Sequence, residues 1–128
     1  MTTVPASYPE ELLYHPEHDW ARIDAQDPAL ATLGITWYAQ DQLGEVVFFE
    51  APDVGAQLSK DASYAEVESV KAVSDVVAPL SGEVVEVNPA LINEDPYGEG
   101  WLVKVRMSDP GERAGLLDAA AYRASLGG

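Results

Sequence analysis

The stretch Glu68-Ser69-Val70-Lys71-Ala72-Val73-Ser74-Asp75 decides how this chain is interpreted. Residues 64–68 and 73–78 on either side are typical of strands, so the pattern predicts a strand, a tight turn and a second strand. Lys71 falls at the tip, and it is one of three lysines in a chain with 7 Lys+Arg against 22 Asp+Glu. A scarce cation at an exposed hairpin tip is a candidate attachment point for a covalent group.

The composition indicates one domain, spanning residues 1–128, with residues 1–10 lying loosely at its surface. The chain has no cysteine. A disulfide framework, a thiolate nucleophile and a cysteine-based zinc site are therefore excluded. Any thiol or redox chemistry has to come from an attached group.

The formal net charge of −15 is the second unusual feature of the composition. Such an acidic chain repels nucleic acid phosphates and anionic membrane surfaces, so neither is an expected partner. The charge suits docking onto basic patches of other proteins, and it also serves solubility. No apolar run reaches the roughly 18 residues of a membrane span. The N-terminus has neither a secretory signal pattern nor an arginine-rich presequence, so we expect a cytoplasmic protein.

Short strands separated by turn residues predict a mainly β fold of the sandwich or barrel type. The strongest expected strands are 45–50, 82–87 and 101–107. In the last, Trp101, Val103, Val105 and Met107 should share one face, with Leu102, Lys104 and Arg106 on the other. The segment Gly44-Glu45-Val46-Val47 recurs as Gly82-Glu83-Val84-Val85, which is either a chance match or a sign of two similar β-halves.

Helix signals appear at two places. Thr36 is a candidate N-cap for a short helix over 37–43 that Gly44 would end. Asp109, Pro110 and Glu112 suit the N-cap, N1 and N3 positions of a C-terminal helix or helix pair within 109–126.

Longer motifs then connect these elements to a known family. They are His18-Asp19-Trp20, Gly34-Ile35-Thr36, Tyr38-Ala39-Gln40, 43–48, 66–75, Ala78-Pro79, Ser81-Gly82 and 93–101. Together they resemble the H protein of the glycine cleavage system over roughly residues 14–122. The segments 66–75 and 93–101 are long and close to the family pattern. Trp37, Ala51 and a shortened segment between Asn88 and Asn93 depart from that pattern.

The resemblance implies a lipoyl/biotinyl-domain-like β-sandwich (a barrel-sandwich hybrid) that carries (R)-lipoate in amide linkage on Lys71. It implies a carrier without catalytic activity of its own. Its expected partners are a glycine decarboxylase (P protein), an aminomethyltransferase (T protein), a dihydrolipoamide dehydrogenase (L protein) and a lipoyl ligase or transferase. Contacts to the arm or to the ligase are expected from Glu68, Ser69, Val70, Ala72 and His18.

Other interpretations stay open from the residues. The chain could be an H-like lipoyl carrier in another pathway, such as sulfur oxidation or lipoyl relay, or an acidic protein-binding sandwich with Lys71 unmodified. Biotin is the rival prosthetic group, but biotin carriers usually flank the lysine with methionine, not with Val70 and Ala72. A Ser69–Lys71 catalytic pair lacks a third group. The cluster of His15, Glu17, His18 and Asp19 lacks further histidines for a metal site, and we expect no metal.

Overall fold

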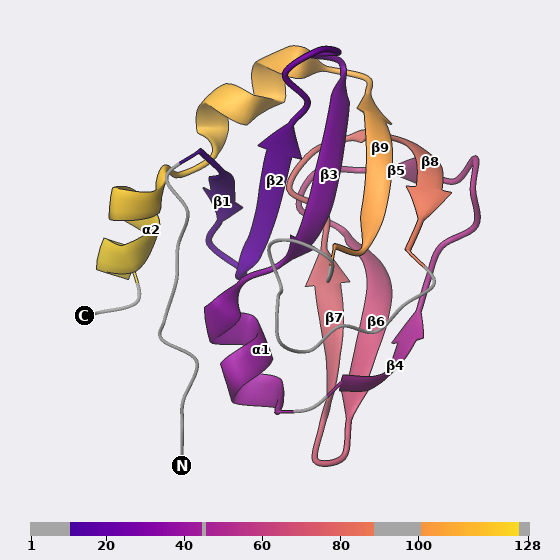
Figure 1. Ribbon diagram of the computed structural model, residues 1–128, viewed down its shortest axis with the longest axis vertical. Coiled ribbons are helices and arrows are strands. Elements are labelled where there is room, and N and C mark those ends of the chain that lie inside the picture. Colours follow the sequence, from indigo (N-terminus) through magenta and orange to yellow (C-terminus); the bar gives the residue numbers. More distant parts are fainter. Residues whose placement is uncertain (1–10, 45, 89–100, 126–128) are drawn as a thin grey trace.

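The computed structural model describes residues 11–44, 46–88 and 101–125 (Figure 1). Three expectations lie outside these ranges: the loose N-terminus 1–10, the shortened segment after Asn88, and residues 93–100 of the long motif. The side chains of Pro110, Arg113 and Arg123 are also not described.

Two antiparallel sheets form the body of the described protein. The larger sheet has the strand order β1-β2-β3-β9-β8-β5, and the smaller has the order β4-β6-β7. The bounds in the larger sheet are β1 Leu13–His15, β2 Asp19–Ile23, β3 Leu30–Ile35, β9 Val103–Met107, β8 Gly82–Val87 and β5 Gln57–Leu58. Those in the smaller sheet are β4 Val46–Glu50, β6 Ser63–Ser69 and β7 Val73–Val77. The predicted mainly β sandwich is confirmed.

The short helix α1 spans Trp37–Leu43, the predicted range. Thr36 caps it, because its side-chain oxygen accepts a hydrogen bond from the Ala39 N–H at 3.3 Å. Gly44 ends it with a φ of 81°, a value that a residue without Cβ adopts most easily.

The C-terminal helix pair is confirmed, although its first member is a 3₁₀ helix. This helix, η1, spans Pro110–Gly115, and α2 spans Ala119–Ser125. Between them the chain touches β1, where Tyr14 and Leu117 exchange two backbone hydrogen bonds of 2.7 Å. Glu112 accepts hydrogen bonds from the Ser81 N–H and hydroxyl, both at 2.8 Å, so it ties η1 to the segment before β8. No helix in the described ranges has the length and apolar character needed to cross a bilayer.

The main core lies between the two sheets and takes buried side chains from β3, β6, β7, β8 and β9. A second, aromatic cluster lies between the larger sheet and α2, and contains Leu12, Tyr14, Trp20, Ala119 and Tyr122. Figure 1 shows α2 beside β1, while the β6–β7 hairpin projects at the bottom of the view below α1.

The expected alternation of residues 101–107 is correct only within β9. Val103, Val105 and Met107 are buried, but so is Leu102, which was expected to face away from them. Leu102 precedes the strand, and its N–H donates to the Leu33 carbonyl at 2.8 Å, so the alternation of the strand does not extend to it.

The valines of the repeated Gly-Glu-Val-Val segments lie in different sheets. Val46 on β4 and Val84 on β8 are buried, whereas Val47 and Val85 are exposed. The two copies therefore present the same valine to the core from different sheets.

Candidate functional site

The β6–β7 connection is a tight hairpin with Val70 and Lys71 at its tip. The Ser69 N–H donates to the Ala72 carbonyl at 2.8 Å, which closes the turn. Two-residue hairpin loops usually need positive φ values, and among the described residues only His18, Asp61 and two glycines have them. The Ser69 hydroxyl oxygen stabilises this turn instead, because it accepts from the N–H groups of Lys71 at 3.3 Å and Ala72 at 3.1 Å.

This use of Ser69 bears on the Ser69–Lys71 catalytic pair considered from the sequence. The serine hydroxyl also donates to the Ala72 carbonyl at 3.3 Å, so it is engaged with the turn backbone. Its role in the structure is to shape the tip.

Lys71 is exposed and makes no salt bridge with any residue of the described ranges. Its neighbours Val70 and Val73 are 81% and 59% exposed. The Lys71 Cε lies 3.6 Å from the position that a Cβ on Gly44 would occupy, so the lysine stem passes the end of α1. The side chain is therefore accessible, and the end of its stem lies beside Gly44.

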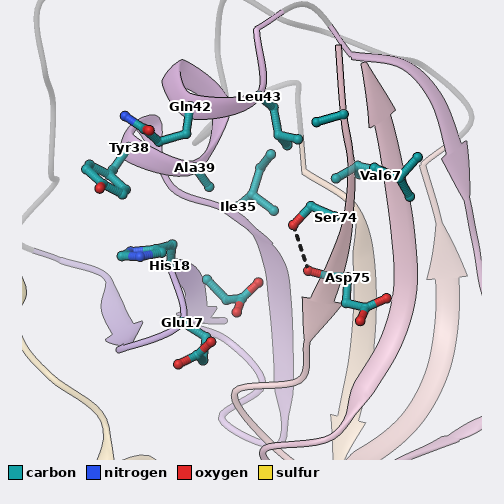
Figure 2. A pocket seen from close by; sticks show the side chains of 13 residues that line it. Glu17, His18, Ile35, Tyr38, Ala39, Gln42, Leu43, Val67, Ser74 and Asp75 are labelled. Atoms are coloured by element: carbon teal, nitrogen blue, oxygen red, sulfur yellow. Dashed lines mark hydrogen bonds between the residues drawn. The ribbon is translucent and has the colours of Figure 1, made fainter. Parts of the chain in front are cut away.

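A pocket of about 270 Å³ adjoins this hairpin and is called the hairpin pocket below. It lies between α1 and the β1–β2 turn on one side and β7 on the other (Figure 2). Three of the lining residues carry carboxyl groups, while Ile35, Leu43 and Val67 give it an apolar wall. The lining residues are Glu17, His18, Asp19, Ile35, Tyr38, Ala39, Gln42, Leu43, Val67, Ala72, Val73, Ser74 and Asp75.

Asp19 is the unusual group of the pocket. It is only 2% exposed, and burial raises its pKa well above the ordinary value, with the nearby Glu17 carboxylate acting in the same direction. A hydrogen bond from the Val77 backbone acts against the rise. The second carboxyl oxygen, Oδ2, is buried and has no hydrogen-bond partner within the described ranges. A buried acceptor without a partner is costly, and it marks a place where a cation or donor would be stabilised.

His18 lines the hairpin pocket on the side of the β1–β2 turn, and a hydrogen-bond network connects it to α2. Its Nδ1 lies 2.8 Å from the Tyr122 hydroxyl, which lies 2.7 Å from the Thr36 hydroxyl. The Thr36 hydroxyl can donate to the Tyr122 hydroxyl, which in turn donates to His18 Nδ1, so all three groups have a partner. In this arrangement the proton of the neutral His18 ring is on Nε2. Burial is the main cause that lowers the pKa of His18, and the nearby Glu17 carboxylate opposes it. His18 also packs on Tyr38, with ring centroids 4.5 Å apart.

His15 has a different role. Its Nδ1 accepts from the Glu17 N–H at 3.0 Å, so Nε2 carries the proton and donates to Asp61 at 2.6 Å. This bond lowers the pKa of Asp61. It joins the β1–β2 turn to the turn before β6. No group of three or more acidic or histidine side chains within the described ranges is arranged to hold a metal ion.

The structure brings only some of the expected contact residues to the pocket. His18 and Ala72 line it, while Glu68, Ser69 and Val70 do not. Glu68 is half-buried on β6, where it pairs with Phe48 and Val73. The sequence reasoning missed Asp19 and Tyr122 as members of the site. The motif His18-Asp19-Trp20 was a signal for the first, but no local pattern indicates the second.

Comparison with known proteins agrees with this geometry. The family model described as "Glycine cleavage H-protein" matches residues 12–127. The glycine cleavage system H protein of Symbiobacterium thermophilum is 52% identical over 93% of this chain and 95% of its own length. That of Marinobacter nauticus is 48% identical over 89% of this chain and 91% of its own.

A solved structure of an H protein is also similar to this chain. The crystal structure of a glycine cleavage system H protein from Mycobacterium marinum superimposes with a TM-score of 0.81 at 40% identity, and it covers 93% of this chain and 98% of that one. The family match thus takes in both sheets, the lysine hairpin and the hairpin pocket, and the chain belongs to the glycine cleavage H-protein family.

Proposed function

We propose that this protein is the lipoyl carrier of the glycine cleavage system, with (R)-lipoate in amide linkage to Nζ of Lys71. The observation that carries the proposal is the exposed lysine at the tip of a tight hairpin, beside a pocket lined by carboxyl groups. Family membership supports it. The absence of cysteine fits a protein that receives its dithiol from outside.

Attachment requires a partner enzyme. The unprotonated amine of Lys71 attacks the carbonyl carbon of an activated lipoyl group, such as an acyl adenylate, the bond to the activating group breaks, and the nitrogen loses a proton. The enzyme provides the base that takes this proton. The ligase or transferase is therefore the first partner that docks at the tip.

When bound, lipoate supplies a disulfide that is reduced as it takes up an aminomethyl group, and a dithiol that is later reoxidised. The proposed partners are the P protein, which loads the arm from glycine, the T protein, which unloads it to tetrahydrofolate, and the L protein, which reoxidises the dithiol. The chain itself catalyses none of these steps. Its residues present the arm and shelter it.

The hairpin pocket suits the loaded end of such an arm, which carries a cationic amine. Asp19 has a buried oxygen without a partner in the described ranges, and Glu17 adds negative charge. A cation beside Asp19 would lower its raised pKa and favour the carboxylate. The apolar wall of Ile35, Leu43 and Val67 would limit access of water to the loaded group.

Intact mass spectrometry of the protein from lipoate-supplied cells tests the attachment. We expect one lipoyl increment in the wild type and in Lys60→Arg, and none in Lys71→Arg, which keeps the charge but not the primary amine. An increment that survives in Lys71→Arg, or its absence from the wild type while a known carrier is lipoylated in the same cells, would refute the assignment.

A second assay tests the pathway. With purified glycine decarboxylase, the lipoylated protein should support exchange between the glycine carboxyl group and labelled bicarbonate, and Lys71→Arg should not. Lipoylation without exchange would move the protein to another lipoyl-dependent pathway.

A further inference from the structure

The outer face of the β4-β6-β7 sheet has an apolar part next to the Lys71 hairpin. Phe48 on β4, Glu68 on β6 and Val73 on β7 are directly paired, and paired residues point to the same side of a sheet. Phe48 is 49% exposed and Val73 is 59% exposed. The two apolar side chains flank Glu68 on the central strand, and exposed apolar groups beside a functional residue indicate a surface that another molecule covers.

The next outward row on the same three strands is entirely acidic. Glu50, Glu66 and Asp75 are directly paired across β4, β6 and β7. They line a hollow of about 230 Å³ together with Ser63 and Tyr64. Like charges directly opposite one another on a sheet are destabilising, and no cationic side chain of the described ranges forms a salt bridge with any of the three.

We propose that this outer face, formed by Phe48, Val73 and the acidic row Glu50-Glu66-Asp75, is the docking surface for the enzyme that attaches lipoate to Lys71. The inference rests on the proposed function. The surface fits a partner that presents an arginine or lysine side chain to the acidic row and apolar side chains to Phe48 and Val73. The cation relieves the repulsion within the row, and the apolar contact lies on the side of the lysine hairpin.

The position of the surface explains how such an enzyme could select this lysine. Lys60 and Lys104 both form salt bridges, to Asp61 and Glu86 respectively, and neither residue lies on β4, β6 or β7. Docking on the outer face places the partner against the two strands that end at Lys71. The enzyme would therefore distinguish Lys71 from the other lysines by the outer face as well as by the sequence of the turn.

The test measures lipoylation of the unmodified protein by a purified lipoyl ligase with ATP and free lipoate, as initial rate against carrier concentration. Glu50→Gln/Glu66→Gln should raise KM about fivefold with little change in kcat, because each exposed charge contact contributes modestly. Raising the salt concentration should reduce the difference between this variant and the wild type. The matched control, Asp53→Asn/Glu83→Gln, removes the same charge from exposed positions outside the β4-β6-β7 sheet and should change KM less than twofold.

A second pair of variants tests the apolar part. Phe48→Thr should raise KM about tenfold, as expected for an aromatic side chain that anchors an interface. Val85→Thr, at an exposed apolar position on β8, should not. Thermal melting shows whether Phe48→Thr is folded; if it is not, the glutamate variants decide.

The docking surface would be refuted if the two double charge variants changed KM equally, or if Glu50→Gln/Glu66→Gln left KM unchanged. Lys71 would remain the attachment site in either case. Failure of the wild type to be lipoylated at all would instead overturn the proposed function.

Discussion

Replacing Tyr122 with phenylalanine removes one hydroxyl that joins two walls of the hairpin pocket. That hydroxyl lies 2.8 Å from His18 Nδ1 and 2.7 Å from Thr36 Oγ1, and Tyr122 is fully buried. Each buried polar group left without a partner costs about 1–3 kcal/mol. Thr36 keeps its bond from the Ala39 N–H and His18 is only partly buried, so we expect a loss of about 2 kcal/mol in the free energy of unfolding.

Urea denaturation at neutral pH measures this loss. The matched control is Tyr38→Phe, the same chemical change at a partly exposed pocket residue whose hydroxyl makes no hydrogen bond with the described part of the chain, and it should cost less than about 0.5 kcal/mol. Combining Tyr122→Phe with Thr36→Val should cost about 1 kcal/mol less than the sum of the single changes, because both remove the same bond.

The pH dependence gives an independent measure of the same network. The folded pKa of His18 is lowered, so the unfolded chain binds the proton more readily and His18 makes the protein less stable as the pH falls below 6.5. Tyr122→Phe removes a donor that favours the neutral ring, so the pKa of His18 should rise and this loss on acidification should shrink. NMR titration of the His18 ring measures the pKa. Additive single costs together with an unchanged His18 titration would refute the network.

Three further predictions concern single residues. Burial raises the pKa of Asp19, so the wild type loses stability as the pH rises through that pKa, whereas Asp19→Asn cannot ionise. In urea denaturation, the stability of the variant relative to the wild type should therefore be about 1–2 kcal/mol higher at pH 8 than at pH 4. An equal difference at both pH values would contradict the raised pKa. Gly82→Ala would place a Cβ against the Arg106 carbonyl oxygen of the paired strand, so it should lose about 1–3 kcal/mol, whereas Gly115→Ala, with nothing within 4 Å, should lose almost nothing. Gly44→Ala should lower the free energy of unfolding by about 1–3 kcal/mol, because φ at this position is 81° and alanine is strained there. A melting temperature equal to that of the wild type would show that the helix end relaxes instead.

Local signals predicted the elements that local interactions form. Thr36 and Gly44 gave both ends of α1, because a side-chain cap and a positive φ are properties of single residues. The hairpin was predictable for the same reason, since Ser69 and Ala72 close it within four residues. The bounds of β1 and β2 were not predicted. Their strands are short, and the turn between them depends on His18 at φ 74°, an unusual value for that residue.

The pocket could not be read from local patterns because distant segments form it. His18 and Tyr122 are 104 positions apart, and the aromatic cluster joins β1, β2 and α2. The cluster of His15, Glu17, His18 and Asp19 was considered from the sequence as a candidate metal site, whereas in the structure His15 bonds to Asp61. It did not reveal that Asp19 lies with an unpartnered oxygen at the pocket, since burial is decided by the strands packed over it.

The pairing of β3 with β9 has a consequence for the synthesis of the protein. Residues 30–33 of β3 pair with residues 103–106 of β9, and Tyr14 pairs with Leu117. The larger sheet can therefore close only when nearly the whole chain has left the ribosome, whereas the lysine hairpin needs only neighbouring residues. Long-range pairing of this kind slows folding. A nascent or truncated chain would thus display its lysine before the larger sheet is complete.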